Sequence, residues 1–199
     1  MDQYFTEAYP DPGPENLKKR KRGLGRLILD IIETAFLALL LFLAINAVSA
    51  RIRIESISMQ PTLFEGDFVM VNRLAYKLGS PERGDVIIFR FPPDPEREPY
   101  IKRVIGLPGD NILARDGMVY VNGVALSEPY ISTPVTYNGE WTVPEEALFV
   151  LGDNRNHSSD SHTWGMVPID NVLGKALVVY LPVSHWQLLD GETATAAEP

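Results

Sequence analysis

The 199-residue sequence contains no cysteine. Disulfide bonds, thiolate metal sites and a cysteine nucleophile are therefore excluded. Histidine is scarce as well, and the chain offers only His157, His162 and His185. The formal net charge of −8 argues against a nucleic-acid partner, because proteins that bind nucleic acids usually present a basic surface. No internal repeat is visible in the sequence.

One long apolar run lies near the N-terminus, at residues 31–50. Twenty residues in a helix rise about 30 Å, which matches the hydrocarbon thickness of a bilayer. We therefore predict a single-pass transmembrane anchor over residues 27–50.

Basic residues are concentrated on one side of this anchor. Residues 18–22 read Lys-Lys-Arg-Lys-Arg and Arg26 follows them, whereas few basic residues come directly after the apolar run. The positive-inside rule then places the N-terminus in the cytoplasm and residues 51–199 outside the plasma membrane. Residues 1–26, rich in polar residues and proline at their start, are predicted to form a disordered, basic cytoplasmic tail.

A cleaved signal sequence is the alternative to an anchor. Residues 47–50 read Ala-Val-Ser-Ala, and these small residues suit cleavage after Ala50. The long region before the apolar run favours an anchor that is not cleaved. The rest of the chain is exported in either case.

Beyond residue 51 the sequence changes to short runs rich in β-branched and aromatic residues, separated by turn-forming residues. The runs predicted as strands are residues 67–72, 85–91, 100–106, 111–114, 118–121, 147–151 and 171–181. They predict a mainly β protein, with an antiparallel barrel-like or sandwich-like domain over residues 51–189 and one N-terminal transmembrane helix. Residues 109–147 are predicted to be a loop-rich insertion, and residues 190–199 a disordered tail.

Two serines, Ser56 and Ser58, lie on one face of a short segment that we expect to be extended. Pro61 fixes its own φ and biases Gln60 towards extended geometry, so the segment should be stiff just beyond Ser58. A hydroxyl on a stiff segment close to a membrane is a candidate nucleophile. The alternative is that both serines only cap or terminate a strand.

A serine nucleophile needs a base, which is usually a histidine oriented by an acid. His157 and Asp160 share one loop, so a triad with Ser58 is conceivable. A zinc site formed by Asp153, His157, Asp160 and His162 is another possibility, although no helix is indicated that would hold all four on one face.

Lys102 is the stronger candidate for the base. On the predicted strand its side chain shares a face with Tyr100 and Val104. Burial on the apolar side of a β domain favours the neutral amine, and lowering the pKa of a lysine from ~10.4 to ~8 costs about 3 kcal/mol. The alternative is a lysine that reaches the surface beside Arg103.

Four motifs resemble those of bacterial type I signal peptidases, which are Ser/Lys serine proteases. Residues 58–63 (Ser-Met-Gln-Pro-Thr-Leu) are similar to the Ser-Met-x-Pro-Thr-Leu motif around the nucleophile of that family. Residues 102–110 resemble the box that holds its general-base lysine, and residues 83–86 and 152–161 fit two further boxes. Order and spacing agree over roughly residues 30–182.

The resemblance implies a role for each matching residue. Ser58 would be the nucleophile and Lys102 the neutral general base. The backbone N–H of Ser58 and the hydroxyl of Ser56 would form the oxyanion hole. Ser158 would orient the amine of Lys102, and Asp160 would support that loop.

One position departs from the family pattern. His162 stands where the family usually has an arginine that pairs with the aspartate, here Asp160. We therefore expect a weaker or pH-dependent ion pair at this position. No metal ion or cofactor is implied.

By the same resemblance, the partners are the signal peptides of preproteins and the lipid bilayer, and not nucleic acid. The peptide would bind extended along the domain, as an added β-strand. Shallow apolar pockets would accept small side chains at the first and third positions before the cleaved bond. The residues at the pocket positions are Ile54, Met59, Leu63, Tyr100 and Ile101.

The sequence thus predicts a membrane-anchored serine endopeptidase that removes N-terminal signal peptides from exported preproteins through an acyl-enzyme. Two alternative functions are a different Ser/Lys protease and a non-catalytic domain. Self-cleaving repressors resemble this family in fold, but they are cytosolic and bind DNA. A non-catalytic, membrane-tethered β domain would not need Ser58 or Lys102.

Overall fold

The computed structural model describes residues 23–189. The predicted tail at residues 190–199, and most of the predicted tail at residues 1–26, lie outside the described residues. The chain divides into two compact units, residues 1–42 and residues 43–199.

Helix α1 (Leu24–Val48) is 25 residues long, and by length and composition it can cross a membrane. Its rise of about 37 Å exceeds the hydrocarbon thickness of about 30 Å. The helix ends two residues before the predicted end of the anchor. Ser49 and Ala50 instead begin strand β1 (Ser49–Arg53), which pairs with strand β2 (Phe68–Asn72). Cleavage after Ala50 would therefore cut inside a paired strand.

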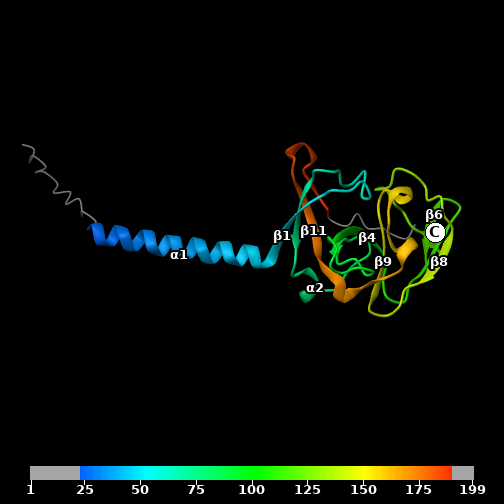
Figure 1. Cartoon of the computed structure of the whole chain (residues 1–199), viewed down its shortest axis with the longest axis horizontal. Helices are drawn as coiled ribbons and strands as arrows, with labels where there is room; N and C mark the ends of the chain where they lie inside the picture. Colours follow the sequence, from blue (N-terminus) through cyan, green and yellow to red (C-terminus); the bar gives the residue numbers. More distant parts are fainter. Residues whose placement is uncertain (1–22, 190–199) are drawn as a thin grey trace, which may run out of the picture. The chain divides into compact units, whose positions relative to one another are not determined.

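The described part of the second unit is built on two antiparallel sheets (Figure 1). The larger sheet continues from β1 and β2 through β11 (Val172–Leu181), β3 (Val86–Phe89), β4 (Tyr100–Gly106), β9 (Ala147–Leu151) and β10 (Val167–Pro168), and β12 (Gln187–Leu188) pairs with β11. The prediction of a mainly β, antiparallel fold is confirmed. Sequence patterns located β4, β6 and β9 to the residue, because each is a short run rich in β-branched or aromatic residues that ends at turn-forming residues.

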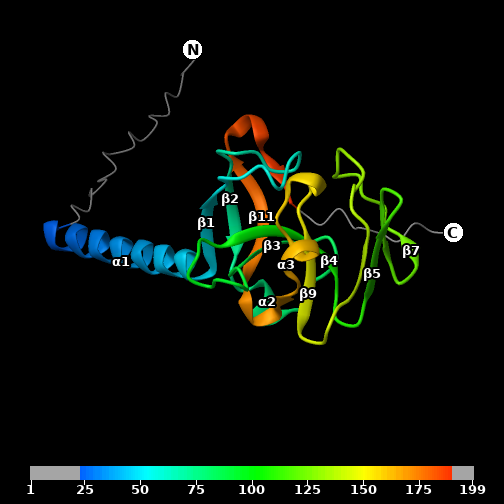
Figure 2. The ribbon, with the colours of Figure 1, turned by 45° about the vertical axis from the view of Figure 1, so that its right-hand side comes forward.

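The smaller sheet has the order β7 (Val124–Ala125), β6 (Met118–Val121), β5 (Asn111–Arg115) and β8 (Gly139–Thr142). Figure 2 shows β5 and β7 standing apart from β1, β2 and β11 of the larger sheet. This sheet corrects the prediction of a loop-rich insertion, which missed β7 and β8.

The missed strand β8 has a physical explanation. Its four residues, Gly-Glu-Trp-Thr, carry no recognisable strand pattern, and its pairing with β5 and its packing decide its conformation. The ring of Trp141 lies 5.1 Å from that of Phe149, which comes from the larger sheet.

Short helical segments connect the strands. They are α2 (Ala75–Leu78), α3 (Ser161–Trp164), and the 3₁₀ turns η1 (Arg155–His157), η2 (Ile169–Asn171) and η3 (Val183–His185). Both η1 and α3 lie in the segment between β9 and β10.

Three apolar clusters fill the second unit. The first lies between the two sheets and includes Ile112 and Phe149. The second lies behind the serine segment and contains Ile54, Met59 and Leu63. The third packs on the β3 and β9 region. The serine segment is therefore fixed on a core and does not lie loosely on the surface.

Candidate active site

The central contact of the site joins Ser58 and Lys102. The Nζ atom of Lys102 lies 2.7 Å from the Oγ atom of Ser58, and it also donates a hydrogen bond of 2.9 Å to the carbonyl oxygen of Ile101. Lys102 comes from β4 and is only 4% exposed, and Ser58 is 8% exposed. A hydroxyl is thus held in direct contact with a buried amine.

Burial changes the protonation of this amine. Desolvation lowers the pKa of Lys102 from 10.5 to about 8, although the charges of Asp160 and Asp153 oppose this shift. A drop of this size corresponds to roughly 3 kcal/mol. A substantial fraction of the amine is therefore neutral near pH 8, which is the form that can accept a proton from a hydroxyl.

The segment that carries Ser58 differs from the extended conformation that we predicted. Ser58 opens a turn over residues 58–62, in which Leu63 N donates to Met59 O. Asn154 holds this turn from outside, because its backbone N donates to Ser58 O at 3.0 Å and its side chain donates to Ile57 O at 3.1 Å.

Gly152 also packs directly against the serine turn. A Cβ atom at this position would collide with the carbonyl oxygen of Ser58 and with Oγ of Ser158. The motif that begins Gly-Asp-Asn therefore places a residue without a side chain where β9 ends beside the nucleophile candidate.

The two predicted serine partners behave differently in the structure. Ser56 Oγ lies 3.2 Å from Ser58 Oγ, so a second hydroxyl lies beside that of the candidate nucleophile. Ser158 Oγ is buried, and within residues 23–189 it has no hydrogen-bond partner. The predicted bond from Ser158 to the amine of Lys102 is therefore not formed in this structure, although Ser158 contacts the same Gly152 as Ser58 does.

Asp160 is fully buried and connects three elements. One carboxylate oxygen accepts a hydrogen bond of 2.9 Å from Gly152 N, and the other lies 2.5 Å from Nδ1 of His162. Its side chain also caps the N-terminus of α3. The ring of His162 is stacked on Tyr137, with centroids 4.0 Å apart and planes 2° from parallel.

The histidine alternatives find no support in this geometry. His157 is exposed, and its Nδ1 lies 3.2 Å from Asn154 Oδ1, while Asp160 contacts His162 instead. The described residues thus place Lys102, and not His157, against Ser58. Among the described residues no group of three histidine or carboxylate side chains could hold a metal ion.

An open groove of about 880 Å³ runs past the Ser58–Lys102 contact. Residues 51–58 form one wall and residues 97–102 the other. Of the predicted pocket residues, the groove is lined by Ile54, Tyr100 and Ile101.

The other two predicted pocket residues do not line the groove. Met59 and Leu63 are fully buried in the core cluster with Ile54, because the turn directs both side chains inward. Ile52, in the segment 52–55 against which the peptide was expected to lie, also lines the groove, and the apolar groove residues that the sequence did not indicate are Ile57 and Ile88. A second hollow of about 200 Å³ is lined by neither Ser58 nor Lys102.

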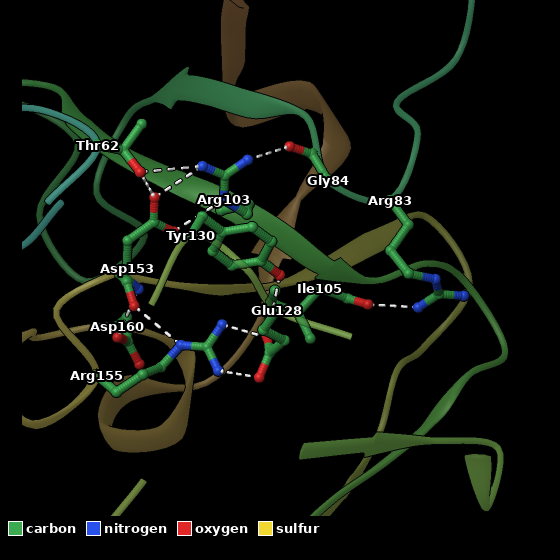
Figure 3. A network of polar contacts seen from close by, with 11 residues as sticks. Thr62, Arg83, Gly84, Arg103, Ile105, Glu128, Tyr130, Asp153, Arg155 and Asp160 are labelled. Atoms are coloured by element: carbon green, nitrogen blue, oxygen red, sulfur yellow. Dashed lines mark hydrogen bonds and ion pairs between the residues drawn. The ribbon is translucent and has the colours of Figure 1, made fainter. Parts of the chain in front are cut away.

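A buried ion-pair network lies behind the site (Figure 3). Arg103 donates two hydrogen bonds to Asp153, of 2.8 and 2.7 Å, and Thr62 Oγ1 lies 2.5 Å from the same carboxylate. The guanidinium of Arg103 is 3.9 Å from the ring centroid of Tyr130. These contacts join β4, the serine turn and the loop after β9.

A second ion pair extends this network. Arg155 is fully buried, and it contacts both carboxylate oxygens of Glu128 at 2.7 and 2.5 Å. Sequence reasoning assigned no role to Arg103, Arg155 or Glu128. The available signal was the strand alternation of β4, which directs Arg103 away from the face of Lys102 and into the interior.

Comparisons with known proteins identify the family of this chain. The sequence model described as "Signal peptidase, peptidase S26" matches residues 28–181. The chain belongs to this family. The resemblance noted from the four motifs is thereby confirmed.

Several relatives within the signal peptidase family are similar over most of their length. A probable signal peptidase I-2 from Synechocystis sp. is 40% identical over 92% of this chain and 87% of its own. A signal peptidase I from Leptolyngbya laminosa is 42% identical over 79% of this chain and 82% of its own. A crystal structure of a signal peptidase I from Enterococcus faecalis has 37% identity and a TM-score of 0.44, over 49% of this chain and 97% of that one.

Proposed function

We propose that this chain is a membrane-anchored serine endopeptidase that removes N-terminal signal peptides from exported preproteins. The observation that carries the proposal is the 2.7 Å contact between Ser58 Oγ and the buried Nζ of Lys102. Membership of the signal peptidase family supports the substrate class.

The chemistry follows from the two groups. The neutral amine of Lys102 takes the proton of the Ser58 hydroxyl as Oγ attacks the carbonyl carbon of the scissile peptide bond. The ammonium that results returns this proton to the leaving amine when the C–N bond breaks, which leaves the signal peptide as an ester on Ser58. Lys102 then takes a proton from water, whose oxygen attacks the carbonyl carbon of the ester. The ammonium returns this proton to Ser58 Oγ when the C–O bond to Ser58 breaks, which releases the signal peptide with its new carboxyl group and regenerates both residues.

Negative charge on the tetrahedral intermediate needs donors at the position where it develops. The backbone N–H of Ser58 and the hydroxyl of Ser56 are our candidates, supported by the 3.2 Å spacing of the two Oγ atoms. A donor of this kind commonly lowers the activation free energy by about 3 kcal/mol. Asp160 would keep the Ser158 loop in place through its contact with Gly152.

The groove suggests how the substrate binds. An extended peptide placed between residues 51–58 and 97–102 can add to the domain as a strand. Ile54, Tyr100 and Ile101 then form shallow apolar walls near the reacting bond, which suits small side chains at the first and third positions before it. Met59 and Leu63 can act only from behind these walls.

Helix α1 is assigned as the anchor in this proposal. Its length fits a bilayer, and the basic residues before it favour a cytoplasmic N-terminus with an extracytoplasmic catalytic domain. The domain boundaries proposed are residues 1–26 for the tail, 27–50 for the anchor and 51–189 for the catalytic domain.

The test is cleavage of a purified preprotein, in detergent, by the full-length wild type, by Ser58→Ala and by Lys102→Met. Wild type is expected to release the signal peptide, and both variants to lose activity by a factor of at least about 10³. Wild-type rates in either variant would contradict the proposal and favour a non-catalytic role.

A further inference from the structure

His162 occupies a defined position between two other side chains. Its Nδ1 atom lies 2.5 Å from Asp160 Oδ1, and its ring lies flat on that of Tyr137. The side chain of His162 is 17% exposed, whereas that of Asp160 is completely buried. A stacked ring cannot turn without leaving its neighbour, so the position of the imidazole, and of the carboxylate that it contacts, is restricted.

The Asp160 carboxylate connects this pair to the reacting residues. Its second oxygen accepts a hydrogen bond of 2.9 Å from Gly152 N, and Gly152 packs against the carbonyl oxygen of Ser58. Asp160 also acts on the other reacting residue, since its negative charge raises the pKa of Lys102 against the larger effect of burial. A change at Asp160 therefore reaches both the nucleophile and the base.

We propose that His162 is a positioning residue, which holds the Asp160 carboxylate against Gly152 and determines how strongly its charge acts on Lys102. This inference rests on the proposed function, because it requires that Lys102 acts as the base. It gives the histidine a role in tuning the reaction.

The charge of the side chain beside Asp160 determines how strongly the carboxylate acts on Lys102. A carboxylate favours the charged form of a nearby amine, whereas catalysis requires the neutral form. An imidazole can exist as a neutral ring and then leaves the carboxylate charge uncompensated. An arginine carries a permanent positive charge, which would offset that of Asp160 and also repel a lysine ammonium directly. Both effects of an arginine lower the pKa of Lys102.

The other charged groups around His162 are limited in number. Asp160 contacts it from its own loop, and Tyr137 faces it from the segment before β8. Beyond Tyr137 lies the Arg155–Glu128 pair, in which the two charges offset each other. Strand β9, which packs against α3, has the sequence Ala-Leu-Phe-Val-Leu and carries no titratable side chain.

The experiment compares the pH dependence of kcat/KM for preprotein cleavage in full-length wild type, His162→Arg and His162→Gln. In the pH profile of kcat/KM, the acidic limb is the part where activity falls as the pH is lowered. For His162→Arg this limb is expected to move to lower pH by roughly 0.5 to 1 unit. His162→Gln keeps a hydrogen-bond donor but supplies no charge, so its limb should remain at higher pH than that of His162→Arg. A purely structural role would change the rate of both variants without separating their limbs.

His185→Arg is the matched control. His185 also contacts a buried carboxylate, with Nδ1 2.7 Å from Asp67 Oδ1, but Asp67 is not among the charges that act on Lys102. The acidic limb of the pH profile of His185→Arg should therefore coincide with that of the wild type.

If His162→Arg does not fold, as judged by circular dichroism, Asp160→Asn takes its place. Removing the carboxylate charge must shift the limb in the same direction. Acidic limbs that coincide in wild type, His162→Arg and Asp160→Asn would overturn the inference. Loss of cleavage in Ser58→Ala, measured in the same assay, would show that the proposed function survives that result.

Discussion

Gly152 and Ser58 are packed so closely that there is no room for a Cβ atom between them. The contact joins the end of β9 to the carbonyl group of the nucleophile candidate. It makes the position of Ser58 depend on the loop from Gly152 to Asp160, which also contributes His157 and Ser159 to the lining of the groove.

Gly152→Ala is accordingly expected to damage the site. The added methyl group must displace either the backbone of Ser58 or the side chain of Ser158, and such overpacking typically costs 1–3 kcal/mol. We expect kcat/KM to fall by a factor of about 100, because small displacements of a nucleophile have effects of that size. The measurement is preprotein cleavage together with thermal unfolding. Gly25→Ala, where a Cβ meets no neighbour within 4 Å, is the control and should leave both unchanged.

Lys102→Met is expected to stabilise the fold while it abolishes activity. The folded-state pKa of Lys102, about 8, lies below its ordinary value of 10.5. Burial of the ammonium therefore opposes folding at pH values below about 8, and this penalty fades as the pH rises towards 10.5. The gain in unfolding free energy of the variant should fall from about 3 kcal/mol at pH 7 to about 1 kcal/mol at pH 10. An equal gain at both pH values, measured by denaturant unfolding, would show that the amine carries no such penalty.

The Arg103–Asp153 pair should be essential for stability. Removal of one partner from a buried pair leaves the other charge uncompensated, which commonly costs 3–5 kcal/mol. We expect a loss of about 3 kcal/mol for Arg103→Ala. The exposed pair of Arg115 and Asp116 offers a matched control, since Arg115→Ala should cost less than about 0.5 kcal/mol. Similar losses in the two variants, measured by denaturant unfolding, would refute this ranking.

The hydroxyl of Tyr137 is buried, and among residues 23–189 it has no hydrogen-bond partner. A buried hydroxyl without a partner destabilises the fold. Tyr137→Phe removes this hydroxyl and keeps the ring that stacks on His162, so we expect a gain of about 1 kcal/mol in unfolding free energy. Tyr130→Phe is the control with the opposite sign, because the hydroxyl of Tyr130 donates to Glu128 at 3.0 Å. Thermal unfolding of both variants tests the pair, and destabilisation by Tyr137→Phe would contradict the prediction.

The sequence was most informative where chemistry is encoded locally. The motif at residues 58–63 and the lysine of β4 are recognisable as candidates from the sequence, and the structure places the side chains of Ser58 and Lys102 in contact. Short runs rich in β-branched and aromatic residues located β4 and β9 for the same reason, because strand formation there follows from adjacent residues.

Long-range packing accounts for what the sequence did not reveal. Met59 and Leu63 were expected to line the groove, but the turn folds both into the core, which alternation along a strand cannot predict. The partner of Arg103 lies 50 residues away and is fixed only by the fold. The strand β8 likewise depends on its neighbour β5 for its conformation.

If a neutral Lys102 activates Ser58, the rate of cleavage must depend on the protonation of Lys102, and the decisive measurement is the pH dependence of kcat/KM for preprotein cleavage by the full-length wild type. Since the free enzyme must lose one proton from Lys102, activity should fall tenfold per pH unit below a midpoint near pH 8. Activity that remains constant down to pH 6 would contradict the account, because at that pH almost all of the amine would be protonated.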